Sequence, residues 1–216
     1  MPYRAKISLY VSLSMNLFYA AFKLFAGILY ASFWYGADAI FFIVLSGMRL
    51  LLFLHVQKEK RDYSAEANDS GVLTKEYRQY RFCGFMLLAL DVAFIGVITQ
   101  IVSHSMGYQY PGHIIYAVAF FTFLFLSLAI KNMVIYRKLN SPVLSAIKAI
   151  SFVKALVALF SLQNTMLITF GDGDVNSAAA RNMMNALTGG CVCLLIFGMA
   201  MYMIIRANKK LRKGNK

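Results

Sequence analysis

The stretch that decides the fold is residues 82–104, FCGFMLLALDVAFIGVITQIVSH, in which Asp91 is the one Asp, Glu, Lys or Arg residue. A transmembrane helix needs about 20 mostly apolar residues to cross the hydrocarbon core of a bilayer, and this stretch meets that requirement. Two similar apolar runs precede it and three follow it, and polar connections separate them. The sequence therefore predicts spans near residues 7–31, 37–56, 82–104, 114–136, 143–170 and 178–205.

The composition also indicates a bilayer as the main solvent. Hydrophobic residues make up 60% of the 216 residues and charged residues 14%, whereas soluble domains have about 45–50% apolar and about 25% charged residues. We therefore expect a single all-α domain over residues 1–216, an integral membrane bundle of six transmembrane helices. The net charge of +13 does not predict nucleic acid as a partner, because the basic residues cluster beside the apolar runs.

The Lys and Arg residues in the connections predict the orientation. Residues 32–36 and 105–113 contain neither, whereas residues 57–81 and 206–216 are rich in both. Because positive charge marks the cytoplasmic side, we expect both termini in the cytoplasm, a cytoplasmic loop over 57–81 and a basic cytoplasmic tail over 206–216. Within that loop, Leu73, Tyr77 and Tyr80 have the spacing of an amphipathic helix. We expect the cell membrane as the location.

Four ionisable residues deep in the spans are candidates for a transport path or a buried ion pair. A charge in hydrocarbon costs at least about 2.5–3.5 kcal/mol, so such residues normally face protein or water. Asp91 and Lys154 are the deepest opposite charges in the sequence, and either a direct pair or a solvated cavity would accommodate them. The candidates are Lys154, Asp91, Asp38 and Lys23.

Other residues in the spans have simpler interpretations. Arg49 and Lys148 lie nearer the cytoplasmic ends, where long cationic side chains can reach the headgroups as anchors. The sixth span has small residues at spacings that permit close helix packing, either within the bundle or in a homodimer. These small residues are Ala186, Gly189, Gly190, Cys193 and Gly198.

The sequence has no pattern typical of an enzyme, a bound cofactor or a metal site. It contains no Ser/His/Asp set and no Gly-rich phosphate loop at a productive spacing. Residues 172–176, DGDVN, begin like a calcium loop, but Ser177 replaces the required Gly. His104 and His113, with Met106 between them, could bind a soft metal, although His is common at membrane boundaries. We therefore expect no catalytic residues, no cofactor and no bound metal.

Three short motifs are shared with a known family of membrane proteins. They are NLFYAAFKLFAGIL at residues 16–29, ADA at 37–39 and RKLNSPVLSA at 137–146, which contains a Ser-Pro turn before a Leu-x-Ala start. In order and position they resemble the cation diffusion facilitator family of metal transporters, over roughly the first two and the last three helices. Six spans with both ends in the cytoplasm also match that family.

The resemblance implies four ligand positions for zinc or a similar ion, two on the second helix and two on the fifth. In this sequence these positions fall on Phe41, Leu45, Ile150 and Lys154. Phe, Leu and Ile side chains have no lone pair, and an ammonium would repel a divalent cation. We therefore expect the metal site to be lost, with the Lys154 ammonium replacing the cation and pairing with an acid such as Asp91 or Asp38.

Two functions follow as expectations. The first is a cation-diffusion-facilitator-like transporter that moves an unidentified substrate or ion other than a divalent metal, with proton coupling as one possibility. The second is a non-transporting scaffold or regulatory subunit that uses the same bundle. The expected partners are the lipid bilayer and either a second copy of the chain or another membrane protein.

Overall fold

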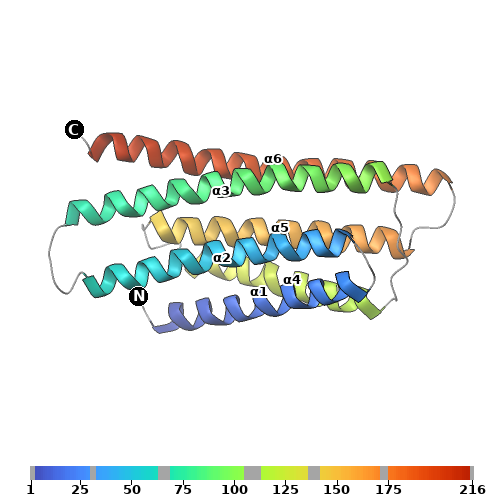
Figure 1. The fold of residues 1–216 in the computed structure, drawn as a ribbon, viewed down its shortest axis with the longest axis horizontal. Helices are drawn as coiled ribbons and strands as arrows, with labels where there is room; N and C mark the ends of the chain where they lie inside the picture. The colour runs from blue at the N-terminus through green and yellow to red at the C-terminus, as the bar shows by residue number, and fades with distance from the viewer. Residues whose placement is uncertain are drawn as a thin grey trace.

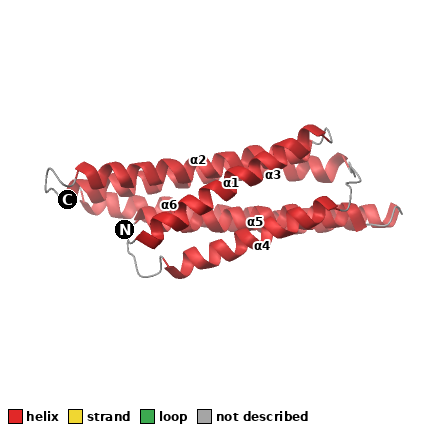
Figure 2. Ribbon diagram, turned by 90° about the horizontal axis from the view of Figure 1, so that it is seen from below, coloured by secondary structure: helices red, strands yellow, loops and turns green. Residues whose placement is uncertain are grey.

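The computed structural model describes six helices, which lie side by side along one common direction (Figures 1 and 2). The described residues are 3–29, 33–62, 69–104, 113–135, 142–170 and 175–214. They form α1 (Tyr3–Leu29), α2 (Phe33–Asp62), α3 (Asp69–His104), α4 (His113–Ile135), α5 (Pro142–Phe170) and α6 (Val175–Gly214).

The helices associate mainly in three pairs. α3 packs along α6, α1 packs along α2 and α4 packs along α5. Figure 1 shows the α3–α6 pair as one layer beside the other four helices. In both ribbon views the start of α1 and the end of α6 lie at the same end of the molecule (Figures 1 and 2).

α5 occupies the centre of the bundle and contacts α2, α3, α4 and α6. In the most apolar segment of α5, 67% of the residues are buried, whereas the corresponding shares are 28% in α3 and 33% in α6. Its buried residues include Val143, Ile147, Val153 and Phe160, which join the main apolar core. Polar residues on α5 are therefore shielded from solvent by the neighbouring helices.

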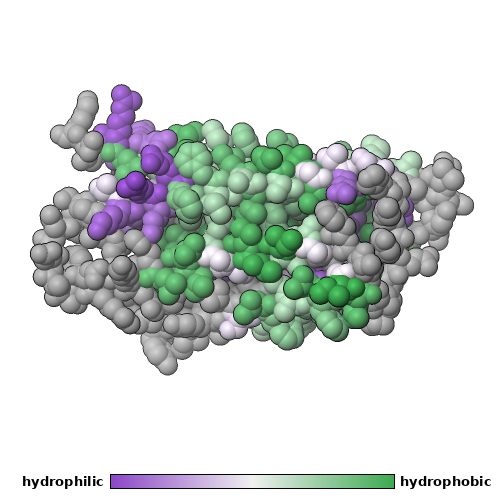
Figure 3. All heavy atoms as spheres, in the orientation of Figure 1, coloured by the Kyte–Doolittle hydropathy of each residue, from purple (hydrophilic) through white to green (hydrophobic). Residues whose placement is uncertain are grey.

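Within the described part of the chain, three helical segments are long and apolar enough to cross a membrane: Thr74–Ser103, Pro142–Phe170 and Ala179–Arg212. Large apolar side chains also face outward on several helices; Phe18, Val92, Phe120 and Leu194 are between 63% and 73% exposed. Figure 3 shows a hydrophobic middle, with hydrophilic residues gathered where α6 ends and α3 begins. Outward apolar surface of this kind is typical of a membrane protein, whose solvent is lipid.

The helices extend beyond the predicted spans. Most of residues 57–81, expected as a loop, is helical, because α2 continues to Asp62 and α3 starts at Asp69. The amphipathic segment with Tyr77 and Tyr80 is therefore the first part of α3 rather than a separate element. Polar, helix-favouring residues on both sides of the connection allow each helix to continue past its apolar part.

Candidate functional site

Buried polar side chains form a stripe along α5. Ser151, Lys154, Ser161 and Thr165 follow one another at spacings of three, seven and four residues, which places them on nearly the same face of the helix. Two of their hydroxyl groups donate to the carbonyl four residues earlier, Ser151 to Ile147 and Thr165 to Ser161, both at 2.8 Å. Such bonds satisfy hydroxyl groups where water is excluded.

A charged network joins this stripe to α1 and α2. The Lys23 ammonium nitrogen lies 2.9 Å from Asp38 Oδ2 and donates to Ser161 Oγ at 2.7 Å. Ser161 Oγ in turn donates to the same Asp38 oxygen at 2.9 Å. The side chains of Lys23 and Asp38 are 0% and 1% exposed, so three helices converge on a desolvated ion pair.

The second carboxylate oxygen of Asp38 takes no part in the hydrogen bonds of this network. Asp38 Oδ1 is buried and has no hydrogen-bond partner among the described residues. A buried carboxylate oxygen without a partner is costly, because it has given up its hydration without receiving a hydrogen bond. It can accept a proton or a polar group of a ligand.

Lys154 lies against an aromatic cluster. Its ammonium nitrogen is 3.6 Å from the centre of the Phe125 ring, a cation–π contact. The Phe125 ring packs 5.0 Å from that of Tyr19, which itself lies 5.4 Å below the Lys23 ammonium. One aromatic cluster from α1 and α4 therefore lies between the two buried lysines.

A direct pair of Asp91 and Lys154 was one of the two arrangements that the sequence left open, and the structure does not show it. Both residues are described, and no ion pair joins them; Asp91, on α3, lies within hydrogen-bonding reach of the Cys193 thiol of α6. The structure instead pairs Asp38 with Lys23, for which the sequence indicated no partner. The reason is tertiary, since α1 packs along α2 whereas α3 packs along α6.

Arg49 is also placed differently from the prediction. It is 1% exposed and ranks among the largest fully buried side chains, so its interpretation as a headgroup anchor is wrong. Its charge lies close enough to Lys154 for the two cations to interact. The side chain of Arg49 is therefore enclosed by the bundle. Lys148, by contrast, is half-buried and lines a groove near the beginning of α5.

The four positions implied by the metal-transporter resemblance are all inside the bundle. Phe41, Leu45, Ile150 and Lys154 are between 0% and 6% exposed, and the three apolar residues belong to one core cluster. The Phe41 ring packs 5.4 Å from that of Phe94. Among the described residues, no group of three or more His, Cys, Asp or Glu side chains could hold a metal ion. The side chains of His104 and His113, together with Met106 and residues 172–174, lie outside the described residues.

Polar contacts between α5 and α6 are features that the sequence did not single out. Asn185 donates to Asn164 Oδ1 at 2.9 Å, and the Gln163 amide donates to Thr188 Oγ1 at 3.0 Å. Asn164 lies three residues after Ser161, and this spacing on a buried helix is the signal that could have identified it. These bonds fix α6 against the polar part of α5.

Small residues bring α3 and α6 together within the bundle. A Cβ added at Gly189 would lie 2.8 Å from Ile98, and one at Gly84 would lie 2.8 Å from Ile204 and 3.2 Å from the carbonyl oxygen of Ala200. Gly189 therefore serves packing inside the chain, whereas Gly190 and Gly198 have nothing within 4 Å of an added Cβ. Gly84 was not among the small residues singled out from the sequence.

Comparisons with known proteins give no relative for this chain. No family model matches it, no curated protein is similar to it, and no solved structure matches its fold.

Proposed function

We propose that the chain is a six-span membrane transporter, with both termini in the cytoplasm, that moves a substrate other than a divalent transition metal. The apolar outer surface of the helices supports residence in a bilayer. The basic residues at the beginning of α3 and the end of α6 gather at one end, and that end is cytoplasmic by the charge rule.

The observation that carries the proposal is the buried network of Lys23, Asp38 and Ser161. Replacement of a buried ion pair by packed apolar residues is often neutral or stabilising. A bundle that served only as a scaffold would therefore gain little from charges at this position. Buried ionisable groups inside a membrane bundle are typical of transport pathways and proton relays.

The geometry supports a simple mechanism in which protonation of Asp38 loosens the bundle. Asp38 Oδ2 is the common acceptor for Lys23 and for the Ser161 hydroxyl, and Oδ1 is open to a proton. A proton on Asp38 would cancel the charge that holds Lys23, and Ser161 would then lose its ionic acceptor. The contact of α1 and α2 with α5 would weaken, so proton uptake would be linked to helix movement.

Lys154 lies on the same face of α5, two turns before Ser161, which is roughly 10 Å along the axis. It occupies a position that would carry a metal ligand in the metal transporters that this sequence resembles. Lys154 and Arg49 are both at most 3% exposed, and a basic side chain at each position disfavours a divalent cation. The proposed path therefore runs along α5 from Lys154 to Ser161.

Flux into proteoliposomes tests the proposal. The expected result is no zinc or manganese uptake above that of empty liposomes, together with dissipation of an imposed pH gradient. This dissipation should be lost in Asp38→Asn and Lys154→Met and retained in Lys131→Ala, which removes an exposed lysine on α4. Saturable zinc uptake that depends on Lys154 would overturn the exclusion of metal.

A scaffold or partner subunit is the second candidate, and dense packing is the observation that favours it. Phe41, Leu45 and Ile150 fill the positions of the implied metal site with apolar side chains that are at most 6% exposed. Proteoliposomes of the wild type that dissipate a pH gradient no faster than Asp38→Asn, and carry no metal, would favour this function over transport.

A further inference from the structure

A groove between α2 and α3 has the layout of a site for one phospholipid. Its apolar part, of about 460 Å³, is lined by α2 and α3, and its cationic part, of about 420 Å³, follows on α3. The two parts share Gln79 and Phe82, so they are continuous. The apolar part is lined by Met48, Leu51, Leu52, Leu54, Gln79, Phe82, Cys83 and Met86.

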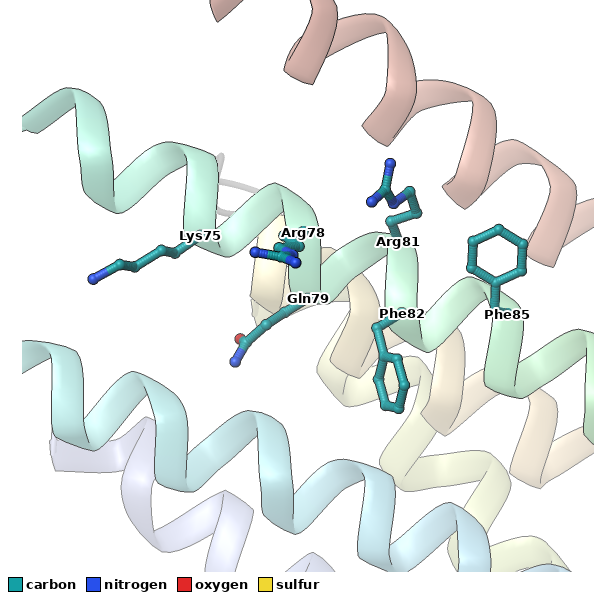
Figure 4. Close-up of a pocket in the computed structure, with 6 residues that line it drawn as sticks. All are labelled: Lys75, Arg78, Gln79, Arg81, Phe82 and Phe85. Carbon is teal, nitrogen blue, oxygen red and sulfur yellow. The ribbon is translucent and has the colours of Figure 1, made fainter.

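Two cations at the mouth of this groove have no partner among the described residues. Neither Lys75 nor Arg78 takes part in an ion pair or hydrogen bond among the residues that the structure describes, and both are exposed. Arg81 differs, because it donates to Asn208 of α6 at 3.2 Å. In Figure 4, Arg81 points toward α6, whereas Gln79 points to the opposite side, toward α2, and Lys75 extends along α3 away from Phe82.

The order of side chains along α3 matches the order of groups in a lipid. Lys75 is followed by Gln79 after one turn and by Phe82 after two turns, roughly 10 Å deeper. Gln79 Oε1 is buried and has no hydrogen-bond partner in the described part of the chain. A phosphate beside Lys75 and Arg78, a hydroxyl donor at Gln79 and an acyl chain along Phe82 and Leu51 would satisfy each of these groups.

We propose that this groove binds an anionic phospholipid with a hydroxylated headgroup, of which phosphatidylglycerol is an example. Charge complementarity favours an anionic lipid over a zwitterionic one, since two free cations face one phosphate. The exposed apolar wall favours a lipid over free phosphate, because Phe82 is 58% exposed and Leu54 50%. This proposal is independent of transport.

Native mass spectrometry of the full chain in detergent tests the site, with dioleoyl phosphatidylglycerol, dioleoyl phosphatidylcholine and inorganic phosphate as separate probes. We expect phosphatidylglycerol to bind more tightly than phosphatidylcholine, and phosphate not to compete at equal concentration. The double variant Lys75→Gln/Arg78→Gln should bind phosphatidylglycerol about 30-fold more weakly, because each cation near an anionic lipid raises the affinity roughly fivefold.

The matched control is the pair Lys209→Gln and Lys210→Gln, which removes the same charge from exposed positions on α6. It should leave the affinity for phosphatidylglycerol close to that of the wild type. An equal loss in both double variants would indicate attraction by net charge alone and would overturn the site. Displacement of the lipid by phosphate at equal concentration would also overturn it, because the apolar part would then contribute nothing.

Discussion

Removal of Lys23 is the perturbation that tests the buried network most directly. At 2.9 Å the Lys23–Asp38 attraction is about 6 kcal/mol with an effective dielectric constant of about 20. Loss of one partner of a buried pair costs about 3–5 kcal/mol, because the remaining charge is left unpaired in a dry interior. We therefore expect Lys23→Met to destabilise the protein by about 3–5 kcal/mol and Asp38→Leu by a similar amount.

The double variant Lys23→Met/Asp38→Leu should cost less than either single variant, since it leaves no buried charge at this site. A coupling energy of at least about 2 kcal/mol is expected from the double-mutant cycle. The assay is reversible unfolding in mixed micelles with increasing dodecyl sulfate, followed by ellipticity at 222 nm. Lys131→Met on the outside of α4 is the control and should stay within about 0.5 kcal/mol of the wild type.

The result that would refute this reasoning is additivity. If the two single costs sum to the cost of the double variant within about 0.5 kcal/mol, the two side chains do not interact energetically. The structural basis of the proposed proton-linked movement would then be lost, because Asp38 would not hold Lys23.

Three further variants test other parts of the structure. Gly84→Ala should destabilise the α3–α6 pair by about 1–3 kcal/mol, since its Cβ would press on the backbone oxygen of Ala200; Gly96→Ala, with nothing within 4 Å, is the control in the same unfolding assay. Asn164→Ala should cost about 1–3 kcal/mol because it leaves the Asn185 amide buried without its acceptor; an unchanged midpoint would contradict this. Lys154→Met should change the free energy of unfolding by less than about 2 kcal/mol, since relief of desolvation offsets the lost cation–π contact. The same variant should abolish flux, and full flux in Lys154→Met would show that Lys154 is not part of the path.

The sequence was sufficient to predict six helices and an apolar exterior. Runs of about 20 apolar residues form helices in lipid because every backbone polar group must be satisfied within its own segment. It was less informative about helix ends, since the polar extension of α3 back to Asp69 continues the same helix without an apolar signal. Local composition predicts which residues avoid water, but it does not predict the residue at which a helix ends.

The sequence also identified the two charged residues of the buried network, and Lys154 on the same stripe of α5, without their partners. Lys23, Asp38 and Lys154 were recognised because charge inside a span is costly, and all three are at most 3% exposed. The ion-pair partner of each buried charged residue depends on which helices are neighbours in the bundle, and these helices can be distant in sequence. Ser161, more than 120 residues after Asp38, joins the ion pair because α5 packs against α2 and the Ser161 hydroxyl lies within hydrogen-bonding distance of Lys23 on α1.

The sequence and the tertiary structure therefore determined different properties of the protein. Hydrophobicity and charge, which are properties of each residue, predicted membrane-spanning helices and identified most of the buried ionisable groups. The pairing of α1 with α2 and of α3 with α6 decided that Lys23 meets Asp38, that Arg49 turns inward and that Asp91 lies beside Cys193. Electrostatic energy depends on the distance between charges, and only the tertiary structure sets that distance.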